Sequence, residues 1–273
     1  MKDNLVTVSN TFIQASYELS LVEKRLLLAF ISQVDNDICK EEGKERDSLE
    51  VITSDTLYNL NVKAYSELYD INYETAKEEL SEAVDKLFQK EVTYRPEEGT
   101  EVTTRWISSK VTYTKGEHII GLKWASDIIP LISELRCNFT SYKLRFLRTL
   151  GSVHSIRLYE IFIMELNKSH KSSIELTLNV QELREILKLE HKYPLFADFM
   201  KRVILDPIQA INSDTNTNIA VSVEDANGNK LYVKKGKKVV AITFKISRKY
   251  QAAETKSLQD KQIEKYGKVL DVV

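Results

Sequence analysis

Two groups of cationic residues in the second half of the chain have the type and spacing needed to bind phosphate groups. One is the adjacent pair Lys201 and Arg202. The other surrounds Gly236 at a predicted turn between two strands and consists of four lysines: Lys234, Lys235, Lys237 and Lys238. Ammonium and guanidinium groups donate charge-assisted hydrogen bonds to phosphate oxygens. Four lysines around one turn exceed what solubility requires, so phosphate contact is favoured over the alternative of a solvated tip.

The adjacent pair lies in a segment with the spacing of an amphipathic helix, Leu195–Leu205. Its apolar face is expected to be buried and consists of Phe196, Phe199, Met200, Val203 and Ile204. The opposite face carries Asp198, Lys201 and Arg202, and Lys192 and Tyr193 come just before the helix. Such a segment spans about 16 Å and fits a major groove about 12 Å wide. Lys201 and Arg202 are therefore predicted to reach base edges or adjacent phosphates.

The segment belongs to an order of elements that occurs twice: helix, strand, two helices and hairpin. The expected elements are 20–31, 49–53, 54–60, 72–89 and 91–124 in the first copy, and 152–167, 174–178, 179–188, 195–212 and 217–247 in the second. This is the order of a winged helix. The sequence therefore predicts an α+β fold with two tandem winged-helix domains, each a helix cluster with a small antiparallel β-hairpin wing.

Local signals set the expected ends of these elements. The expected N-caps are Ser20, which forms a capping box with Glu23, then Thr53 or Ser54, and Asn72. Residues 5–19 alternate loosely and predict an edge strand. Pro130 predicts a break in a short helix at 125–135. Asp206 followed by Pro207 predicts a new N-cap and a kink late in the second domain.

The first winged helix offers a weaker set of DNA contacts. Thr75 and Lys77 lie on the exposed face of the helix Tyr73–Gln89, and Arg105 and Lys110 lie in the hairpin that follows. Acidic residues share that helix face, so a purely solvated face and a DNA-contacting face are equal alternatives.

Charge is divided unevenly along the chain. The net charge is −1, but residues 1–130 hold 15 Lys and Arg against 24 Asp and Glu, whereas residues 131–250 hold 20 against 12. A basic second half fits phosphate contact, and Arg145 and Arg148 are expected to take part in it. An acidic first half fits protein contact, with chance variation of a solvated surface as the alternative.

We therefore expect three parts. Residues 1–135 form an N-terminal winged helix for protein contact and secondary DNA contact. Residues 136–249 form the C-terminal winged helix for principal DNA recognition, and 250–273 form a tail of unknown role.

The sequence contains no pattern typical of catalysis, a metal site or a cofactor site. The phosphate loop G-x-x-x-x-G-K-[ST] is absent, which argues against ATP-driven helicase chemistry. Cys39 and Cys137 are far apart and predict free thiols in a reducing cytosol. The histidines are scattered and have no ligand spacing: His118, His154, His170 and His191. Without a visible export signal or an apolar run of about 18 residues, we expect a cytoplasmic protein that is not an enzyme and does not contact membranes.

Four stretches resemble plasmid replication initiators of the Rep_3 superfamily. They are Leu19-Ser-Leu-Val-Glu-Lys-Arg-Leu26, Ser152-Val-His-Ser-Ile-Arg-Leu-Tyr-Glu160, Phe196-Ala-Asp-Phe-Met-Lys-Arg-Val-Ile-Leu-Asp-Pro-Ile-Gln-Ala-Ile-Asn212 and Lys235-Gly-Lys-Lys-Val-Val-Ala-Ile-Thr-Phe244. The resemblance covers roughly residues 5–247. By this resemblance, Lys201 and Arg202 belong to the recognition helix of the second domain, and Arg157 is either a structural residue or a DNA-backbone contact.

The resemblance implies a non-enzymatic protein of the bacterial cytosol, associated with plasmid or nucleoid. Its first domain, residues 1–135 here, would be the dimerisation element. Monomers would bind origin repeats called iterons and open the nearby duplex, whereas homodimers would bind an operator inverted repeat and repress the protein's own gene. Host replication initiator and helicase factors would be further partners. Three alternatives remain: a winged-helix transcriptional repressor without replication activity, a rolling-circle nickase, which the missing histidine cluster disfavours, and a protein-interaction module, which the basic second half disfavours.

Overall fold

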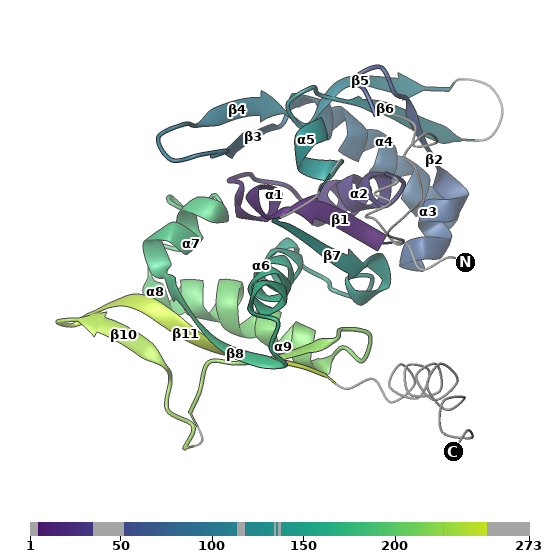
Figure 1. Ribbon diagram of the computed structural model, residues 1–273. Helices are drawn as coiled ribbons and strands as arrows, with labels where there is room; N and C mark the ends of the chain where they lie inside the picture. The colour runs from purple at the N-terminus through teal and green to yellow at the C-terminus, as the bar shows by residue number, and fades with distance from the viewer. Residues whose placement is uncertain are drawn as a thin grey trace, which may run out of the picture.

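The computed structural model describes residues 5–34, 52–113, 118–133, 135, 138–225 and 227–249, which form two winged helices (Figure 1). The first contains the helices α2 (Leu21–Ile31), α3 (Val62–Tyr69) and α4 (Tyr73–Gln89). The second contains α6 (Val153–Ser169), α7 (Val180–Ile186) and a long helix in three parts: α8 (Phe196–Phe199), η2 (Met200–Leu205) and α9 (Asp206–Ser213). The predicted fold class is confirmed.

The same types of cap begin the corresponding helices of the two domains. Ser20 begins α2 with the predicted capping box, and the Ser152 hydroxyl accepts the Ser155 amide at the start of α6. Asn61 and Asn179 end a strand and cap the next helix, α3 and α7 respectively. Because the side-chain oxygen of each cap satisfies an unpaired amide of the first turn, the chain changes from strand to helix at the same place in both domains.

The predicted helix at 54–60 is wrong. The described chain is a turn followed by the strand β2 (Tyr58–Asn61), and the helix begins later, at Val62. Tyr58 and Leu60 point into the core on alternate positions, which is the periodicity of a strand. The N-cap is Asn61 rather than Thr53 or Ser54. The predicted strand at 49–53 lies mostly outside the described residues, and residues 52 and 53 are not in a strand.

Antiparallel sheets complete each domain. In the first, β6 (Ile119–Trp124) lies between β2 and β5 (Ile107–Thr112), and β3 (Glu91–Tyr94) pairs with β4 (Val102–Arg105). In the second, β11 (Lys238–Arg248) pairs with β8 (Ser173–Asn179), β9 (Ile219–Ser222) and β10 (Tyr232–Lys235). The predicted hairpin regions are therefore confirmed, the first as two hairpins. Residues 114–117, between β5 and β6, lie outside the described residues.

Residues near the start of the chain pair with residues that follow the first domain's sheets. The expected edge strand is β1 (Leu5–Ser9), followed by a short helix, α1 (Asn10–Gln14); β1 pairs antiparallel with β7 (Phe139–Lys143). Pro130 does not break a helix, because it lies in the first turn of α5 (Ile129–Ile132), where its missing amide hydrogen costs nothing.

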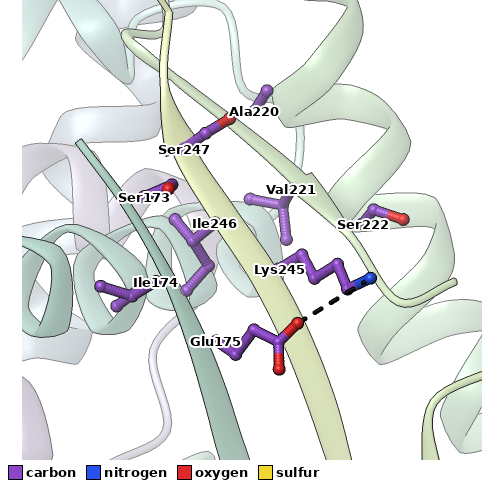
Figure 2. Close-up of a pocket in the computed structure, with 9 residues that line it drawn as sticks. All are labelled: Ser173, Ile174, Glu175, Ala220, Val221, Ser222, Lys245, Ile246 and Ser247. Atoms are coloured by element: carbon purple, nitrogen blue, oxygen red, sulfur yellow. Dashed lines mark ion pairs between the residues drawn. The ribbon is translucent and has the colours of Figure 1, made fainter. Parts of the chain in front are cut away.

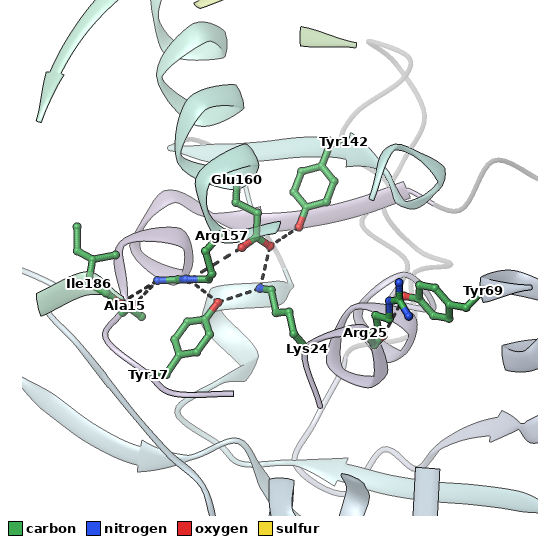
Figure 3. A network of polar contacts seen from close by, with 9 residues as sticks. All are labelled: Ala15, Tyr17, Lys24, Arg25, Tyr69, Tyr142, Arg157, Glu160 and Ile186. Carbon is green, nitrogen blue, oxygen red and sulfur yellow. Dashed lines mark hydrogen bonds and ion pairs between the residues drawn. The ribbon is translucent and has the colours of Figure 1, made fainter. Parts of the chain in front are cut away.

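A buried ionic pair connects α2 to α6 (Figure 3). The Lys24 ammonium lies 2.8 Å from the Glu160 carboxylate, and both side chains are fully buried. Lys24 also donates to the Tyr17 hydroxyl at 2.8 Å, and Tyr142 donates to Glu160 at 2.6 Å. Burial and the neighbouring carboxylate raise the pKa of Tyr142 well above its ordinary value, so it remains a donor. These bonds satisfy one carboxylate oxygen of Glu160, whereas Oε2 has no hydrogen-bond partner and lies 3.9 Å from the Arg157 guanidinium.

Arg157 extends this network toward α7. Its guanidinium donates to the carbonyl oxygens of Ala15 at 2.8 Å and Ile186 at 3.1 Å, and it lies 3.9 Å from the Tyr17 ring centroid. The residue is 2% exposed. A buried guanidinium cannot contact the DNA backbone, so Arg157 is the structural residue of the two alternatives.

Candidate nucleic-acid interface

The predicted recognition helix of the second domain has its cations on the solvent side. Asp198, Lys201 and Arg202 are exposed, as the apolar spacing predicted. The side chains of the opposite face pack into the core: Phe199, Met200, Val203 and Ile204, with Phe196 half-buried. The hydrophobic contacts of one face thus hold the polar face toward solvent.

The expected new N-cap at Asp206 is wrong. Asp206 has helical dihedral angles, φ −60° and ψ −45°, so the helix continues through it. Residues Met200–Leu205 instead form a π-helical stretch immediately before Pro207. Proline has no amide hydrogen and crowds the carbonyl four residues earlier, and a wider turn accommodates this defect. Lys201 and Arg202 lie in this widened turn.

The turn before the recognition helix is held by Arg184, which lies in α7. Its guanidinium donates to the carbonyl oxygens of Leu189 at 3.2 Å, Lys192 at 2.7 Å and Tyr193 at 2.8 Å. It also lies 4.3 Å from the centroid of the Phe199 ring. Tyr193 has a left-handed backbone with φ 51°, an unfavourable conformation for a bulky residue. Arg184 therefore fixes both the turn and the helix that follows.

Lys192 and Tyr193, two of the predicted DNA contacts, are engaged within the protein. Lys192 donates to Glu18 at 2.7 Å, and this bond lowers the pKa of the Glu18 carboxyl. Tyr193 is half-buried, and its ring packs on His154 with centroids 6.2 Å apart. Lys192 thus already has a carboxylate partner within the protein, and Tyr193 an aromatic one.

The β10–β11 hairpin forms a basic wing attached to the recognition helix. Its tip is Gly236, with φ 64°, and the exposed lysines flank it as predicted: Lys234, Lys235, Lys237 and Lys238. Tyr232, in β10, packs edge-to-face on Phe196 at the start of α8, with centroids 5.8 Å apart. The aromatic contact makes the wing and the helix one unit, and Figure 1 shows the hairpin extending from the sheet beside α8.

The cations of this unit are available for an external partner. Within the described part of the chain, no carboxylate forms an ion pair with Lys201, Arg202 or the four wing lysines. An unpaired cation can bind a phosphate without first losing a protein contact, so its full charge contributes to binding.

The side chains of the first domain that are predicted to contact DNA lie close to other groups of the protein or to acidic residues. Lys77 lies 4.0 Å from Glu74, and Lys110 forms an ion pair with Asp85. Arg105 lies 5.9 Å from the Phe88 ring centroid, and Thr75 is exposed on α4. The exposed acidic residues of α4 surround these groups: Glu74, Glu78, Glu82 and Asp85.

Arg145 and Arg148 lie on the η1 turn (Leu144–Phe146) and just after it, beside the first domain. The Arg148 guanidinium is 3.9 Å from Asp70, the C-cap of α3, and Arg145 lies 5.4 Å from the Phe146 ring centroid. The structure thus ties Arg148 to α3 rather than to the recognition helix.

Family models match nearly all of the described chain. The model of initiator replication protein, WH1, matches residues 5–163, and that of initiator Rep protein, WH2, matches 179–246. The chain belongs to the initiator replication protein family. The first match continues into α6, past the expected boundary at 135, whose position stays a prediction.

Two curated relatives and one solved structure resemble this initiator. A replication initiation protein of Escherichia coli is 26% identical over 273 residues, covering 98% of this chain and 77% of that protein. A 27.6 kDa protein of Escherichia coli, described as uncharacterized, is 25% identical over 224 residues, with 81% and 90% covered. The crystal structure of the Pi initiator protein in complex with iteron DNA has a TM-score of 0.66 at 20% identity, covering 92% of this chain and all of that one.

The described residues of the initiator contain no group of three or more potential metal ligands and no helix long and apolar enough to cross a membrane. A shallow pocket lies on the β8–β11–β9 sheet (Figure 2). Its charged lining consists of Glu175 and Lys245, which pair with each other at 3.8 Å. The remaining lining is small or aliphatic, so the pocket offers no free charge to a ligand.

Sequence reasoning missed Arg184 and Glu18 in the initiator. The position of Arg184 in a predicted helix gave no sign that its three acceptors lie in the turn that follows. Glu18 is separated from Lys192 by 174 positions, so only the folded chain reveals this pair.

Proposed function

We propose that this replication initiator binds iterons, the short direct repeats of a plasmid origin, through its second winged helix. The observation that carries the proposal is the set of unpaired cations on the recognition helix and on the wing, which the contact between Phe196 and Tyr232 joins: Lys201, Arg202 and the four wing lysines. Lys201 and Arg202 are assigned to base edges or adjacent phosphates in the major groove, and the wing is assigned to phosphates. The likeness to an initiator crystallised with iteron DNA supports this assignment.

The remaining predicted contacts have secondary roles in this proposal. Lys192, Tyr193 and Asp198 border the base-reading surface, and Arg145 and Arg148 grip flanking phosphates. In the first domain, Thr75, Lys77, Arg105 and Lys110 make limited contacts, because acidic residues surround them. The first domain, 1–135 in the division we keep, contributes mainly to a homodimer, and 136–249 to DNA recognition.

The proposal extends to the steps that follow binding. Monomers on the iterons promote local duplex opening and recruit host initiator and helicase factors in the bacterial cytosol. Dimers on an operator inverted repeat repress the protein's own gene. These steps need no catalysis by the chain and depend on the protein's ability to distort DNA and to contact other proteins.

A gel-shift and footprinting titration on the DNA that flanks the protein's own gene tests the proposal. At two salt concentrations, stepwise ladders over short direct repeats, weakened by salt, are expected. A single protected inverted repeat, with no support of origin-plasmid replication in cells, would instead identify a repressor. Absence of any specific protection would refute the assignment of Lys201, Arg202 and the wing.

A further inference from the structure

Leu195 stands out on the predicted recognition surface because it is apolar and exposed. Its side chain is 66% exposed, more than any other large hydrophobic side chain of the described residues. Single exposed leucines are common on protein surfaces, so exposure alone does not distinguish Leu195. What distinguishes Leu195 is its position, immediately before α8 and in the same helix-forming segment as the unpaired Lys201 and Arg202, where a bound partner would contact it.

The corresponding residue of the first domain shows what this position normally does. Asn72 precedes α4, and its side chain accepts the Glu74 amide as an N-cap. Leu195 occupies the N-cap position of α8 and makes no side-chain cap. Leucine is among the poorest N-caps. The second domain thus has a residue at this position that is unfavourable for the helix itself.

The backbone at Leu195 is nevertheless well fixed. Arg184 holds the preceding turn through the carbonyls of Lys192 and Tyr193. On the other side, Phe196 packs on Tyr232 of the wing. Leu195 is therefore a side chain presented to solvent from a rigid point between helix and wing.

The surroundings of Leu195 favour duplex DNA as its partner. Leu195 immediately precedes α8, whose exposed face carries Asp198, and Lys201 and Arg202 follow on the exposed face of η2. Arg202 and the neighbouring Lys201 are exposed and unpaired among the described residues. In the major groove, the apolar group that a side chain can contact is the C5-methyl of thymine.

We infer that Leu195 contacts a thymine methyl group and thereby contributes to the sequence preference of this initiator. The inference rests on the proposed function and assigns a particular base contact to one residue of the proposed DNA-binding surface. The contact is purely apolar, so it discriminates thymine from cytosine and also from uracil, which lacks only the methyl group.

The test replaces each thymine of the footprinted site, one at a time, with deoxyuridine. Wild-type protein is expected to lose about three- to tenfold in affinity at one or two of these positions. Leu195→Ala is expected to bind unmodified DNA more weakly by a similar factor and to bind thymine and uracil equally at those positions. Leu57→Ala, at another exposed leucine, located in the first domain, should behave as wild type.

A second variant separates a DNA contact from a structural role. Leu195→Asn introduces the cap that Asn72 provides in the first domain, so it is expected to raise Tm while weakening DNA binding. A structural role would move stability and binding in the same direction. Unchanged affinity of the Leu195 variants, or retained discrimination between thymine and uracil at every position, overturns the inference. Failure of the wild type to protect any site would instead overturn the proposed function.

Discussion

The two winged helices share their architecture but differ in whether the lysines and arginines predicted to contact DNA are paired with carboxylates. In the first, Lys77 and Lys110 of the predicted DNA-binding surface are paired with carboxylates, and α4 exposes a row of acidic residues. In the second, Lys201, Arg202 and the wing lysines have no carboxylate partner within the described chain. A shared fold therefore leaves open which domain binds DNA, and the difference in charge pairing is the observation on which the proposed role of the second domain rests.

The largest expected effect concerns the buried ion pair that connects α2 to α6. Lys24→Met leaves the Glu160 carboxylate buried without its ammonium partner, which typically costs about 3–5 kcal/mol of unfolding free energy. Denaturant unfolding followed by circular dichroism measures it. The control is Arg95→Met in the exposed Arg95–Glu101 pair, with an expected loss below about 1 kcal/mol. Equal losses in the two variants would mean that the buried pair does not hold α2 to α6.

The next effect concerns the salt dependence of DNA binding. The slope of log K against log salt changes by about 0.9 for each phosphate neutralised on duplex DNA. Replacing the four wing lysines with alanine is therefore expected to reduce the slope by about 3 to 4. The matched control replaces four ion-paired lysines of the first domain: Lys77, Lys86, Lys110 and Lys123. If the salt-dependence slope of the control variant falls as far as that of the wing variant, the two domains do not differ in how many phosphates their lysines neutralise.

Much of this comparison could be predicted from the sequence, but the state of the cations could not. Apolar spacing correctly placed Asp198, Lys201 and Arg202 on the exposed face, because burial of one helix face is a local property of the pattern. The strand β2 was mistaken for a helix, because four residues are too few to establish a period. Charge pairing such as Lys110 with Asp85, 25 positions apart, depends on how β5 packs beside α4.

The third effect concerns the single residues that we propose contact bases. Lys201→Ala and Arg202→Ala are each expected to weaken specific binding by about tenfold, since a good base contact contributes about 1–3 kcal/mol. Lys77→Ala should weaken it less than about threefold, because that ammonium is already near Glu74. A gel-shift titration at fixed salt measures all three. Unchanged affinity of the Lys201 and Arg202 variants would remove them from the interface.

A smaller effect should follow from freeing a cation in the first domain. Asp85→Asn removes the carboxylate that pairs with Lys110 on β5. The released ammonium is expected to raise affinity for non-specific duplex DNA by about twofold at low salt. Glu97→Gln changes the net charge equally but frees no paired lysine, and serves as the control. If both variants gain equally, general charge rather than the local pair limits DNA contact by the first domain.

The smallest effect is a pH dependence at the turn before the recognition helix. Burial, with Lys192 and Arg157 nearby, lowers the pKa of His154 in the folded chain. The unfolded chain therefore binds a proton at a higher pH than the folded chain does. The contribution of neutral His154 to the free energy of unfolding is thus fully present above about pH 6.5. It is lost as the pH falls toward the lowered pKa of the folded chain.

His154→Gln removes this titration and should flatten the decline of unfolding free energy between neutral and mildly acidic pH. His191→Gln removes an exposed histidine of the turn between α7 and α8 and is the control. Because His154 packs on Tyr193, whose carbonyl accepts from Arg184, its protonation disturbs the turn that sets the recognition helix. Specific DNA binding should therefore weaken in the same pH range in the wild type and less in His154→Gln. A pH profile of the wild type that matches His154→Gln would show that the turn does not depend on this imidazole.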